Sequence, residues 1–536
     1  MYLNDAVGRS KMRVIYCHHE QACAMAADGY ARIAGKPAAV IVTGGPGGIN
    51  ALNGVFGAYT DSVPMVVVSG QSKKSTLGGL AYSSSCSFLR QLGDQEVNIV
   101  KMAEGVTKWA TQVRNEYVNS QTAVLGAVSG RPGPVWIDVP VDVQALEAKS
   151  VDIWRKDGRQ GDVPVQEINK LLAGAKRPVI LAGSGVRISG AVGDLKKLAE
   201  LTDIPVVTAW ACDAFPSDHP NWCGRQGTVG DYAGNWAVQN SDLLLILGSR
   251  LSIRQISYNW ASFAPKAYKI WVDIDPAELE KPTIRPDLPV VSDIKRFMRC
   301  LSAHVIACHN KYWLGECRFR ASICQVVKDK HRKDHTINPY HFIEILSSHL
   351  EDDEVVVTGD ATACISTFQA LPIRAKQRLI SNSGSASMGW CLPAAIGAAA
   401  AHGKRVTCIT GDGSIMQNIQ ELATIAHYNL PIRIFVMDNG GYASIKSSQQ
   451  RHFGSVYGAG KSSGVGFANA REVAESFGIK SSLAVTPREI AFMGTPSLVQ
   501  MLTDRSYEQE PRLESKRLPD GTMETASLDS LGEYHG

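Results

Sequence analysis

Two glycine-containing turns, each directly after an apolar run, constrain the fold of this chain more than any other sequence feature. The run 406–410 leads into Gly411-Asp412-Gly413-Ser414, and the run 432–437 leads into Asp438-Asn439-Gly440-Gly441. The segment between the runs has the length of one helical crossover, which predicts neighbouring parallel strands. Because ligands bind at the carboxyl ends of such strands, both turns are expected at one ligand-binding edge.

The residue types in these turns suit a magnesium site that holds a diphosphate. The Asp412 carboxylate, the Asn439 amide oxygen and a backbone carbonyl, for which Gly441 is the candidate, are hard oxygen ligands. Glycines beside Asp412 let the main chain approach an anion, and the N–H groups that open the next helix can bind it. Two ordinary turns are the alternative interpretation. The candidate cofactor-binding residues of this region are Gly411, Asp412, Gly413, Ser414, Asn439, Gly441 and Tyr442.

The rest of the chain alternates short apolar runs with helical stretches, which predicts an α/β fold of three doubly wound parallel-sheet domains. A chain of 536 residues is too long for a single hydrophobic core. The predicted strands are 14–17, 39–42, 65–69, 135–139, 178–183, 205–208, 242–248, 269–274, 354–358, 405–410 and 432–437. The predicted helices are 21–33, 50–58, 193–202, 340–350, 393–401 and 418–427.

Polar stretches between these series set the expected domain boundaries. We expect a first domain over 1–145, a central domain over 165–305 and a third domain over 336–510. A polar arm over 511–536 is expected to follow them on the surface.

Charge and composition exclude several function classes. The formal net charge of +4, with no run of Lys and Arg, provides no basic stripe for nucleic acid. No apolar run is long enough to span a bilayer, and the N-terminus lacks the apolar core of a signal peptide. The twelve cysteines are scattered and are interpreted as reduced thiols. We therefore expect a cytoplasmic protein without a nucleic-acid or membrane partner.

The segment GDGSIMQNIQELATIAHYNLPIRIFVMDN, residues 411–439, resembles the signature of the thiamine-diphosphate enzymes. It is very similar to the acetolactate synthase branch of that superfamily, and the resemblance covers almost the whole chain. It implies thiamine diphosphate and Mg²⁺ as cofactors. It also implies that the three domains are a pyrimidine-binding, a central and a diphosphate-binding domain.

The resemblance assigns roles to three places in the first domain. Glu20, in the run 18–21, matches the glutamate that hydrogen-bonds the aminopyrimidine ring and favours its imino tautomer. Without the resemblance, this residue would be interpreted as compensation of a helix dipole or, beside two histidines, as part of a zinc site. Pro46 and Asn50 lie in a glycine-rich loop that resembles the one beside the pyrimidine, and Gln95 matches the active-site glutamine of the synthases.

Two further loops are similar to family loops. Gly384, Ala386 and Met388 lie in a segment that resembles the one whose methionine supports the bent cofactor, although a core methionine is the alternative. The segment 248–254 is similar to the flavin-side loop, but Leu251-Ser252-Ile253 replaces its usual Phe-Asp-Asp, so FAD binding stays open. The family divides each active site between two subunits, which implies a homodimer or tetramer.

The implied reaction is decarboxylation of a 2-oxo acid, with pyruvate as the default donor, and transfer of the two-carbon unit to a second carbonyl compound, as in branched-chain amino acid biosynthesis. Asp94, Val141 and Ser448 replace a phenylalanine, a lysine and a tryptophan of the family, which leaves the acceptor open. The chain begins after the family's first helix and strand, so the first domain is expected to be shortened at its N-terminus. The alternatives are another decarboxylase or carboligase of a specialised pathway, and a catalytically silent cofactor-binding homologue.

Overall fold

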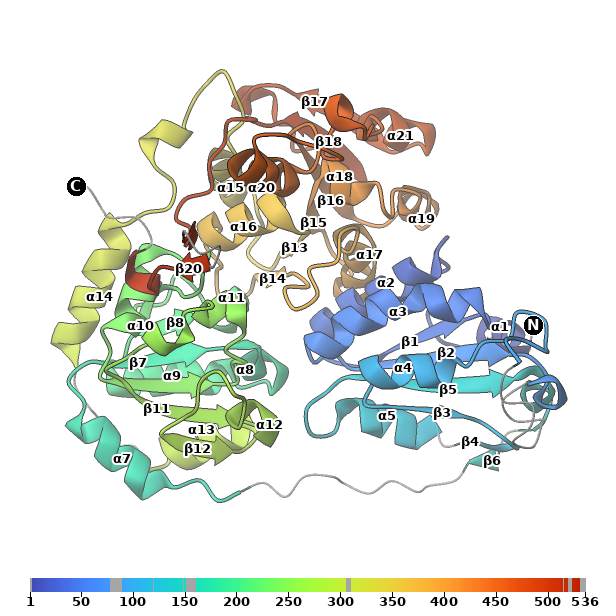
Figure 1. Cartoon of the computed structure of the whole chain (residues 1–536), viewed down its shortest axis with the longest axis horizontal. Coiled ribbons are helices and arrows are strands. Elements are labelled where there is room, and N and C mark those ends of the chain that lie inside the picture. Colours follow the sequence, from blue (N-terminus) through green and yellow to red (C-terminus); the bar gives the residue numbers. More distant parts are fainter. Residues whose placement is uncertain are drawn as a thin grey trace.

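The computed structural model describes residues 2–77, 89–118, 120–147, 149–150, 161–304, 310–513, 515–518 and 523–530. Within these ranges the chain forms three larger sheets whose strand pairs are all parallel, and helices cover their faces (Figure 1). The prediction of three parallel-sheet α/β domains is therefore confirmed. The domain boundaries stay predictions, and residue 305 and parts of the arm 511–536 lie outside the described residues. No described helix is both long and apolar enough to cross a membrane.

The first sheet has the strand order β1-β2-β5-β3. Its strands are β1 (Ala38–Val42), β2 (Met65–Gln71), β3 (Trp109–Gln112) and β5 (Pro134–Pro140), and β4 (Tyr117–Val118) pairs with β6 (Lys149–Ser150) outside it. Its helices are α1 (Tyr2–Arg9), α2 (Glu20–Ala34), α3 (Pro46–Thr60), α4 (Ile99–Ala103), α5 (Ser120–Val128) and α6 (Val141–Gln144).

The prediction of a strand over 14–17 is wrong. This segment has no regular secondary structure and pairs with no strand of the described chain. Ile15 packs instead against the core of the third domain, and the Tyr16 N–H donates to the Tyr428 hydroxyl over 3.1 Å. The apolar run is buried by contact with another domain, which sequence periodicity cannot distinguish from burial in a sheet.

The central sheet has the order β12-β11-β10-β7-β8-β9. Its strands are β7 (Pro178–Ala182), β8 (Val206–Thr208), β9 (Trp222–Arg225), β10 (Leu243–Leu247), β11 (Tyr268–Asp273) and β12 (Leu288–Val291). Its helices are α7 (Val165–Gly174), α8 (Ser184–Ile188), α9 (Val192–Thr202), α10 (Tyr232–Gln239), α11 (Ile253–Ile256), α12 (Pro276–Leu279), α13 (Ile294–Ser302) and α14 (Lys311–Ile323). Every residue of β7 and β10 is buried, as continuous apolar runs in the middle of a parallel sheet require.

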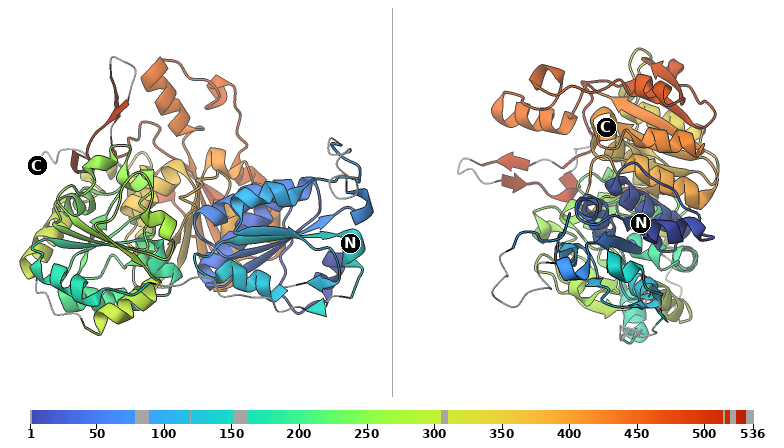
Figure 2. Two further views of the ribbon diagram at one scale, coloured as in Figure 1. Left: turned by 60° about the horizontal axis from the view of Figure 1, so that its bottom comes forward. Right: turned by 90° about the vertical axis from the view of Figure 1, so that its right-hand side faces the viewer.

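The third sheet has the order β14-β13-β15-β16-β18-β17. Its strands are β13 (Val355–Thr358), β14 (Arg378–Ile380), β15 (Val406–Gly411), β16 (Ile432–Asp438), β17 (Lys480–Ala484) and β18 (Ser497–Leu502). Its helices are α15 (Pro339–Ser348), α16 (Ala361–Ala370), α17 (Cys391–His402), α18 (Asp412–Ile415), α19 (Glu421–His427), α20 (Ala443–Phe453) and α21 (Ala470–Ser476). The strand pair predicted from the two turns is confirmed, because β15 and β16 are parallel neighbours. A separate ribbon of β19 (Ser515–Arg517) and β20 (Met523–Thr525) projects from the body (Figure 2).

Helices α2 and α17 join the first and third domains (Figure 1). Their backbones meet through glycines: a Cβ on Gly29 would lie 2.1 Å from the Ala394 carbonyl oxygen, and one on Gly397 would lie 1.7 Å from that of Ala26. Such close approach excludes any side chain at either position. The first residue of α2, Glu20, is thereby fixed relative to the third domain.

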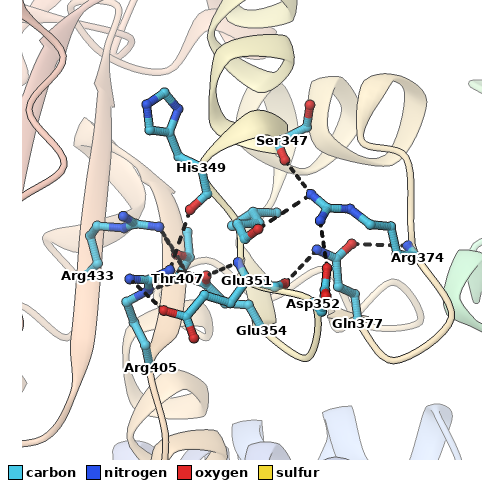
Figure 3. A network of polar contacts seen from close by, with 11 residues as sticks. Ser347, His349, Glu351, Asp352, Glu354, Arg374, Gln377, Arg405, Thr407 and Arg433 are labelled. Atoms are coloured by element: carbon cyan, nitrogen blue, oxygen red, sulfur yellow. Dashed lines mark hydrogen bonds and ion pairs between the residues drawn. The ribbon is translucent and has the colours of Figure 1, made fainter.

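A buried ion-pair network lies at the amino ends of the strands of the third sheet (Figure 3). Glu354 is 1% exposed, and its carboxylate binds Arg405 over 2.7 Å, Arg433 over 3.2 Å and the Thr407 hydroxyl over 2.6 Å. Burial opposes ionisation of Glu354, but these partners hold its pKa below the ordinary value. The network lies opposite the carboxyl edge, so we interpret it as structural.

Candidate functional site

Asp412 and Asp438 emerge side by side at the carboxyl edge of the third sheet. In the pairing of β15 with β16, Gly411 lies opposite Met437, so the next residue of each strand reaches the same edge. Asp412 is 7% exposed and accepts the N–H of Gly413 over 2.9 Å. Burial and the neighbouring Asp438 raise the pKa of Asp412 to about 7. Two adjacent carboxylates, one buried and one half-buried, are an environment that a bound cation stabilises.

Asn439 and Gly441 complete this cluster. The Asn439 Oδ1 atom is buried and has no hydrogen-bond partner among the described residues. Buried amide oxygens are nearly always hydrogen-bonded, so an orphaned one beside a carboxylate fits a metal ligand. The N–H of Gly441 donates to the Asp412 carboxylate. Gly441 has φ 127°, and a Cβ there would lie 2.1 Å from the Ala459 carbonyl oxygen. Gly441 therefore lies against Asp412, and Asn439 lies between Asp438 and Gly441 in the loop that follows β16. A carboxylate and an amide oxygen are donor types that suit a divalent cation.

Ser414 links this turn to two further loops. Its hydroxyl donates to Asp360 Oδ1 over 2.9 Å and accepts the N–H of Gly389 over 2.9 Å. A Cβ on Gly413 would lie 2.4 Å from the Tyr442 ring, so the glycine lets that aromatic side chain cover the turn. The Tyr442 ring thus packs directly on the turn from Gly411 to Ser414.

Sequence reasoning missed two carboxylates of this cluster, Asp438 and Asp360. Asp360 follows β13 and precedes α16, and burial raises its pKa. Gly359-Asp360 repeats the pattern of a strand followed by Gly-Asp, and that pattern could have identified it. Asp438 could have been found from its place at the carboxyl end of a buried strand.

Glu20 lies in a second cluster, within the first domain. Its Oε2 accepts a hydrogen bond from Asn50 Nδ2 over 3.1 Å, and a Cβ on Gly47 would lie 3.1 Å from its Oε1. Gly45, with φ 60°, allows the Gln95 backbone to approach, because a Cβ there would lie 2.2 Å from the Gln95 carbonyl oxygen. The structure therefore brings four predicted site residues together: Glu20, Pro46, Asn50 and Gln95.

The segment before Glu20 is held from two sides. His19 caps α2 because its Nδ1 accepts the N–H of Gln21 over 3.0 Å. Glu421, at the start of α19, accepts the N–H groups of His18 and His19 over 3.0 and 3.2 Å. The His19 ring thus serves as a helix cap, and a third-domain carboxylate fixes the backbone that leads to Glu20.

The segment of Gly384, Ala386 and Met388 lies between β14 and α17. Gly384 and Ala386 are exposed, and Met388 is half-buried, whereas Trp390 is buried. Partial exposure leaves the Met388 side chain available to a ligand. Glu20 and Asp412 share no hydrogen bond or ion pair within the described chain, so the two clusters are separate groups of contacts.

A cavity of about 380 Å³ lies where the three domains meet. Gly183, Ser249 and Arg250 of the central domain line it, together with Arg32 and Asp61 of the first domain. Two nitrogen atoms of other lining residues, Nε of Arg187 and Nε1 of Trp210, are buried without a hydrogen-bond partner among the described residues. The cavity can therefore accept a ligand that offers acceptor oxygens.

Comparison with known proteins matches all three domains to one family. Residues 1–112, 165–301 and 358–494 match the N-terminal TPP-binding, central and C-terminal TPP-binding domains of thiamine pyrophosphate enzymes. Thiamine pyrophosphate and thiamine diphosphate are the same compound. The predicted resemblance is confirmed, and both clusters lie in or beside domains that match TPP-binding models.

Several curated relatives are similar over most of their length. The probable acetolactate synthase large subunit of Methanocaldococcus jannaschii is 33% identical over 513 residues, which are 91% of this chain and 83% of the relative. The acetolactate synthase large subunit of Lactococcus lactis is 31% identical over 93% of this chain and 87% of the relative. Isozyme 2 of Escherichia coli is 32% identical over 85% of this chain and 81% of the relative.

Proposed function

Because the chain belongs to the thiamine pyrophosphate enzymes, we propose that it is an acetolactate-synthase-like carboligase. It decarboxylates a 2-oxo acid, with pyruvate as the default donor, and transfers the two-carbon unit to a second carbonyl compound. The observation that carries the proposal is the cluster of Asp412, Asn439 and Gly441 at the carboxyl edge of the third sheet. Its orphaned amide oxygen and buried carboxylate are the groups that a Mg²⁺-bound diphosphate needs.

The proposed binding roles follow from these contacts. Asp412 and the Asn439 side chain hold Mg²⁺ together with a backbone carbonyl at Gly441. The turn from Gly411 to Ser414 presents its backbone to the diphosphate, and Tyr442 covers it. Thiamine diphosphate, when bound, supplies the carbon nucleophile and the electron sink for loss of CO₂.

The proposed role of Glu20 is proton exchange with the aminopyrimidine ring. The hydrogen bond from Asn50 fixes one carboxylate oxygen and leaves the other, beside Gly47, available to the ring. Gln95, beside the same loop, would contact the substrate, and Met388 would support the cofactor from the third-domain side.

A second copy of the chain completes the proposed site. Helix α3, which carries Asn50, exposes Ile49, Phe56 and Tyr59 at 42%, 40% and 40% on its surface. Large apolar side chains clustered beside a candidate active site are typical of an interface. We propose a homodimer, or a tetramer built as a dimer of dimers, in which this face of α3 is covered.

FAD is the candidate ligand of the cavity at which the three domains meet. Nε of Arg187, which meets Asp213 at 3.9 Å but makes no hydrogen bond, supports an FAD phosphate or ribose there, as do Nε1 of Trp210 and the Ser249-Arg250 turn. The replacement of the family's Phe-Asp-Asp by Leu251-Ser252-Ile253 weakens that support. Absorbance between 350 and 500 nm, roughly the range of oxidised flavin, on the purified protein would test it.

We also propose a cytoplasmic location, because the ten cysteines in the described ranges are all free thiols.

The deciding experiment supplies the purified full chain with thiamine diphosphate, Mg²⁺ and a series of 2-oxo acids, alone and with aldehyde or 2-oxo acid acceptors. CO₂ release and acetolactate formation are measured together. Release without carboligation would favour the alternative of a decarboxylase from a specialised pathway. Saturable cofactor binding without CO₂ release from any 2-oxo acid would overturn the proposal in favour of a catalytically silent homologue.

A further inference from the structure

The loop between β14 and α17 carries a backbone conformation that its own residues do not favour. Ala386 has φ 51°, in the left-handed region that disfavours residues with a Cβ. Such a conformation persists only where the surrounding structure enforces it. Within the loop, the Ala386 N–H donates to the Asn382 carbonyl over 2.8 Å. Two further polar contacts, one on each side of Ala386, come from the first domain of the same chain.

The first contact is made by Asp61, at the end of α3. Its Oδ1 accepts the N–H of Gly384 over 3.1 Å, and its Oδ2 pairs with Arg32 Nη2 over 2.9 Å. Arg32 Nη1 donates to the Ser381 carbonyl over 3.0 Å. One ion pair therefore holds two points of the loop, both before Ala386.

The arginine of this pair is itself fixed. Its Nε donates to Oδ1 of Asp28 over 2.6 Å, and Asp28 is fully buried on α2. Oδ2 of Asp28 accepts the indole N–H of Trp390 over 2.8 Å. Arg32 thus pairs with two carboxylates, those of Asp28 and Asp61. These charge-assisted bonds fix the direction in which its N–H groups point to Asp61 and Ser381.

The contact at Gly384 leaves no free space. A Cβ there would lie 2.3 Å from Asp61 Oδ1 and 2.8 Å from the Thr60 hydroxyl oxygen. The glycine thus lets the loop backbone reach the carboxylate directly.

The second contact lies on the other side of Ala386. Ser387 donates to Asn53 Oδ1 over 2.7 Å, and Asn53 Nδ2 donates to Gln21 Oε1 over 3.0 Å. Gln21 directly follows Glu20 on α2, and Asn53 lies one turn after Asn50 on α3. The α3 surface that holds the Glu20 carboxylate therefore also holds the residue next to Met388.

We propose that Asp61 and Asn53 are positioning residues that hold the Gly384–Met388 loop in its cofactor-binding conformation. The inference rests on the proposed cofactor role of that loop. Without either side chain the loop relaxes toward backbone conformations that Ala386 prefers. Cofactor binding must then restore the strained form, which lowers affinity in proportion to the population lost.

The test measures the dissociation constant of thiamine diphosphate for the full chain by titration calorimetry in saturating Mg²⁺. Asp61→Asn and Asn53→Ala should each weaken binding about 10-fold, or roughly 1.4 kcal/mol. Asp275→Asn is the matched control, because Asp275 also pairs with an arginine across a domain boundary, Arg131, over 2.9 Å. It should leave the constant within about twofold of wild type.

A double-mutant cycle separates positioning from general packing. Gly384→Ala displaces the Asp61 carboxylate, so it and Asp61→Asn should weaken binding by similar factors, and the double variant should be little worse than either single one. Additive losses would overturn the proposal, as would unchanged affinity in Asp61→Asn and Asn53→Ala or an equal loss in Asp275→Asn. Each of these results is obtained with a wild type that binds the cofactor. A wild type that binds none would instead contradict the proposed function.

Discussion

Asn50 holds Glu20: its Nδ2 donates to the carboxylate Oε2 over 3.1 Å, from a different helix and thirty residues along the chain. Glu20 opens α2, where the helix dipole stabilises a negative charge, and Asn50 provides a neutral donor that fixes its direction. A glutamate at a helix start is ordinary. One aimed across a glycine turn by an asparagine on the next helix is pre-positioned for a ligand.

Replacement of Glu20 by glutamine should lower turnover and spare cofactor affinity. The amide keeps an oxygen for the Asn50 hydrogen bond but cannot exchange a proton with the aminopyrimidine ring. General acid–base groups typically contribute 10²–10⁴-fold, so we expect kcat to fall by about that factor. Steady-state kinetics and calorimetry on one preparation measure both quantities. Turnover at the wild-type rate would remove Glu20 from the proposed mechanism.

Replacement of Asp412 by alanine should abolish Mg²⁺-dependent binding of thiamine diphosphate. The variant loses the only carboxylate among the three proposed ligands, so we expect at least a roughly 100-fold rise in half-saturating cofactor, as for other strong metal-site defects. Asp353→Ala is the control, since Asp353 pairs with Lys404 over 2.5 Å at the opposite, amino edge of the sheet and should leave cofactor binding unchanged. An Asp412→Ala protein that saturates at the wild-type cofactor concentration would contradict the ligand assignment.

Much of the fold could be predicted because its central strands are continuous buried runs. β10 and β16 lie within one residue of their predicted ends, and both are apolar over almost their whole length. Strands such as β3 and β17 were not predicted, since they are short, partly exposed and polar. The strand predicted over 14–17 is absent for a different reason: its apolar run is buried against another domain and not in a sheet.

Some residues of the candidate site could likewise be predicted from sequence, and others could not. Asp412 and Asn439 could be predicted because each directly follows a strand, so local sequence places both at one edge. The contact of Asp61 with Gly384 joins residues 323 positions apart. No local pattern encodes that contact, because it exists only once α2 and α17 have packed. Sequence therefore identifies groups that follow strands, whereas the residues that position them need the tertiary structure.

Replacement of Phe56 by glutamate should weaken self-association and activity together. A charge on the apolar face of α3 must be desolvated when a second copy covers that face, which is strongly unfavourable. Tyr312→Glu is the control, because Tyr312 is 88% exposed on α14 of another domain. Sedimentation velocity at several concentrations should show smaller species for Phe56→Glu alone. Identical sedimentation of both variants and wild type would exclude this face from the interface.

Replacement of Glu354 by glutamine should destabilise the protein, and by less at low pH. Removing one partner of a buried ion pair costs about 3–5 kcal/mol, because Arg433 is left buried without its counter-charge. The lowered pKa of Glu354 means that its ionised form contributes stability above the ordinary value of 4.5, and that this contribution is lost as the pH falls below it. Urea unfolding at pH 7 should therefore show a larger difference from wild type than at pH 4. Glu344→Gln, at the more exposed Arg332–Glu344 pair, should cost no more than about 1 kcal/mol at either pH. If the two variants unfold alike at pH 7, the network in Figure 3 does not stabilise the third domain in this way.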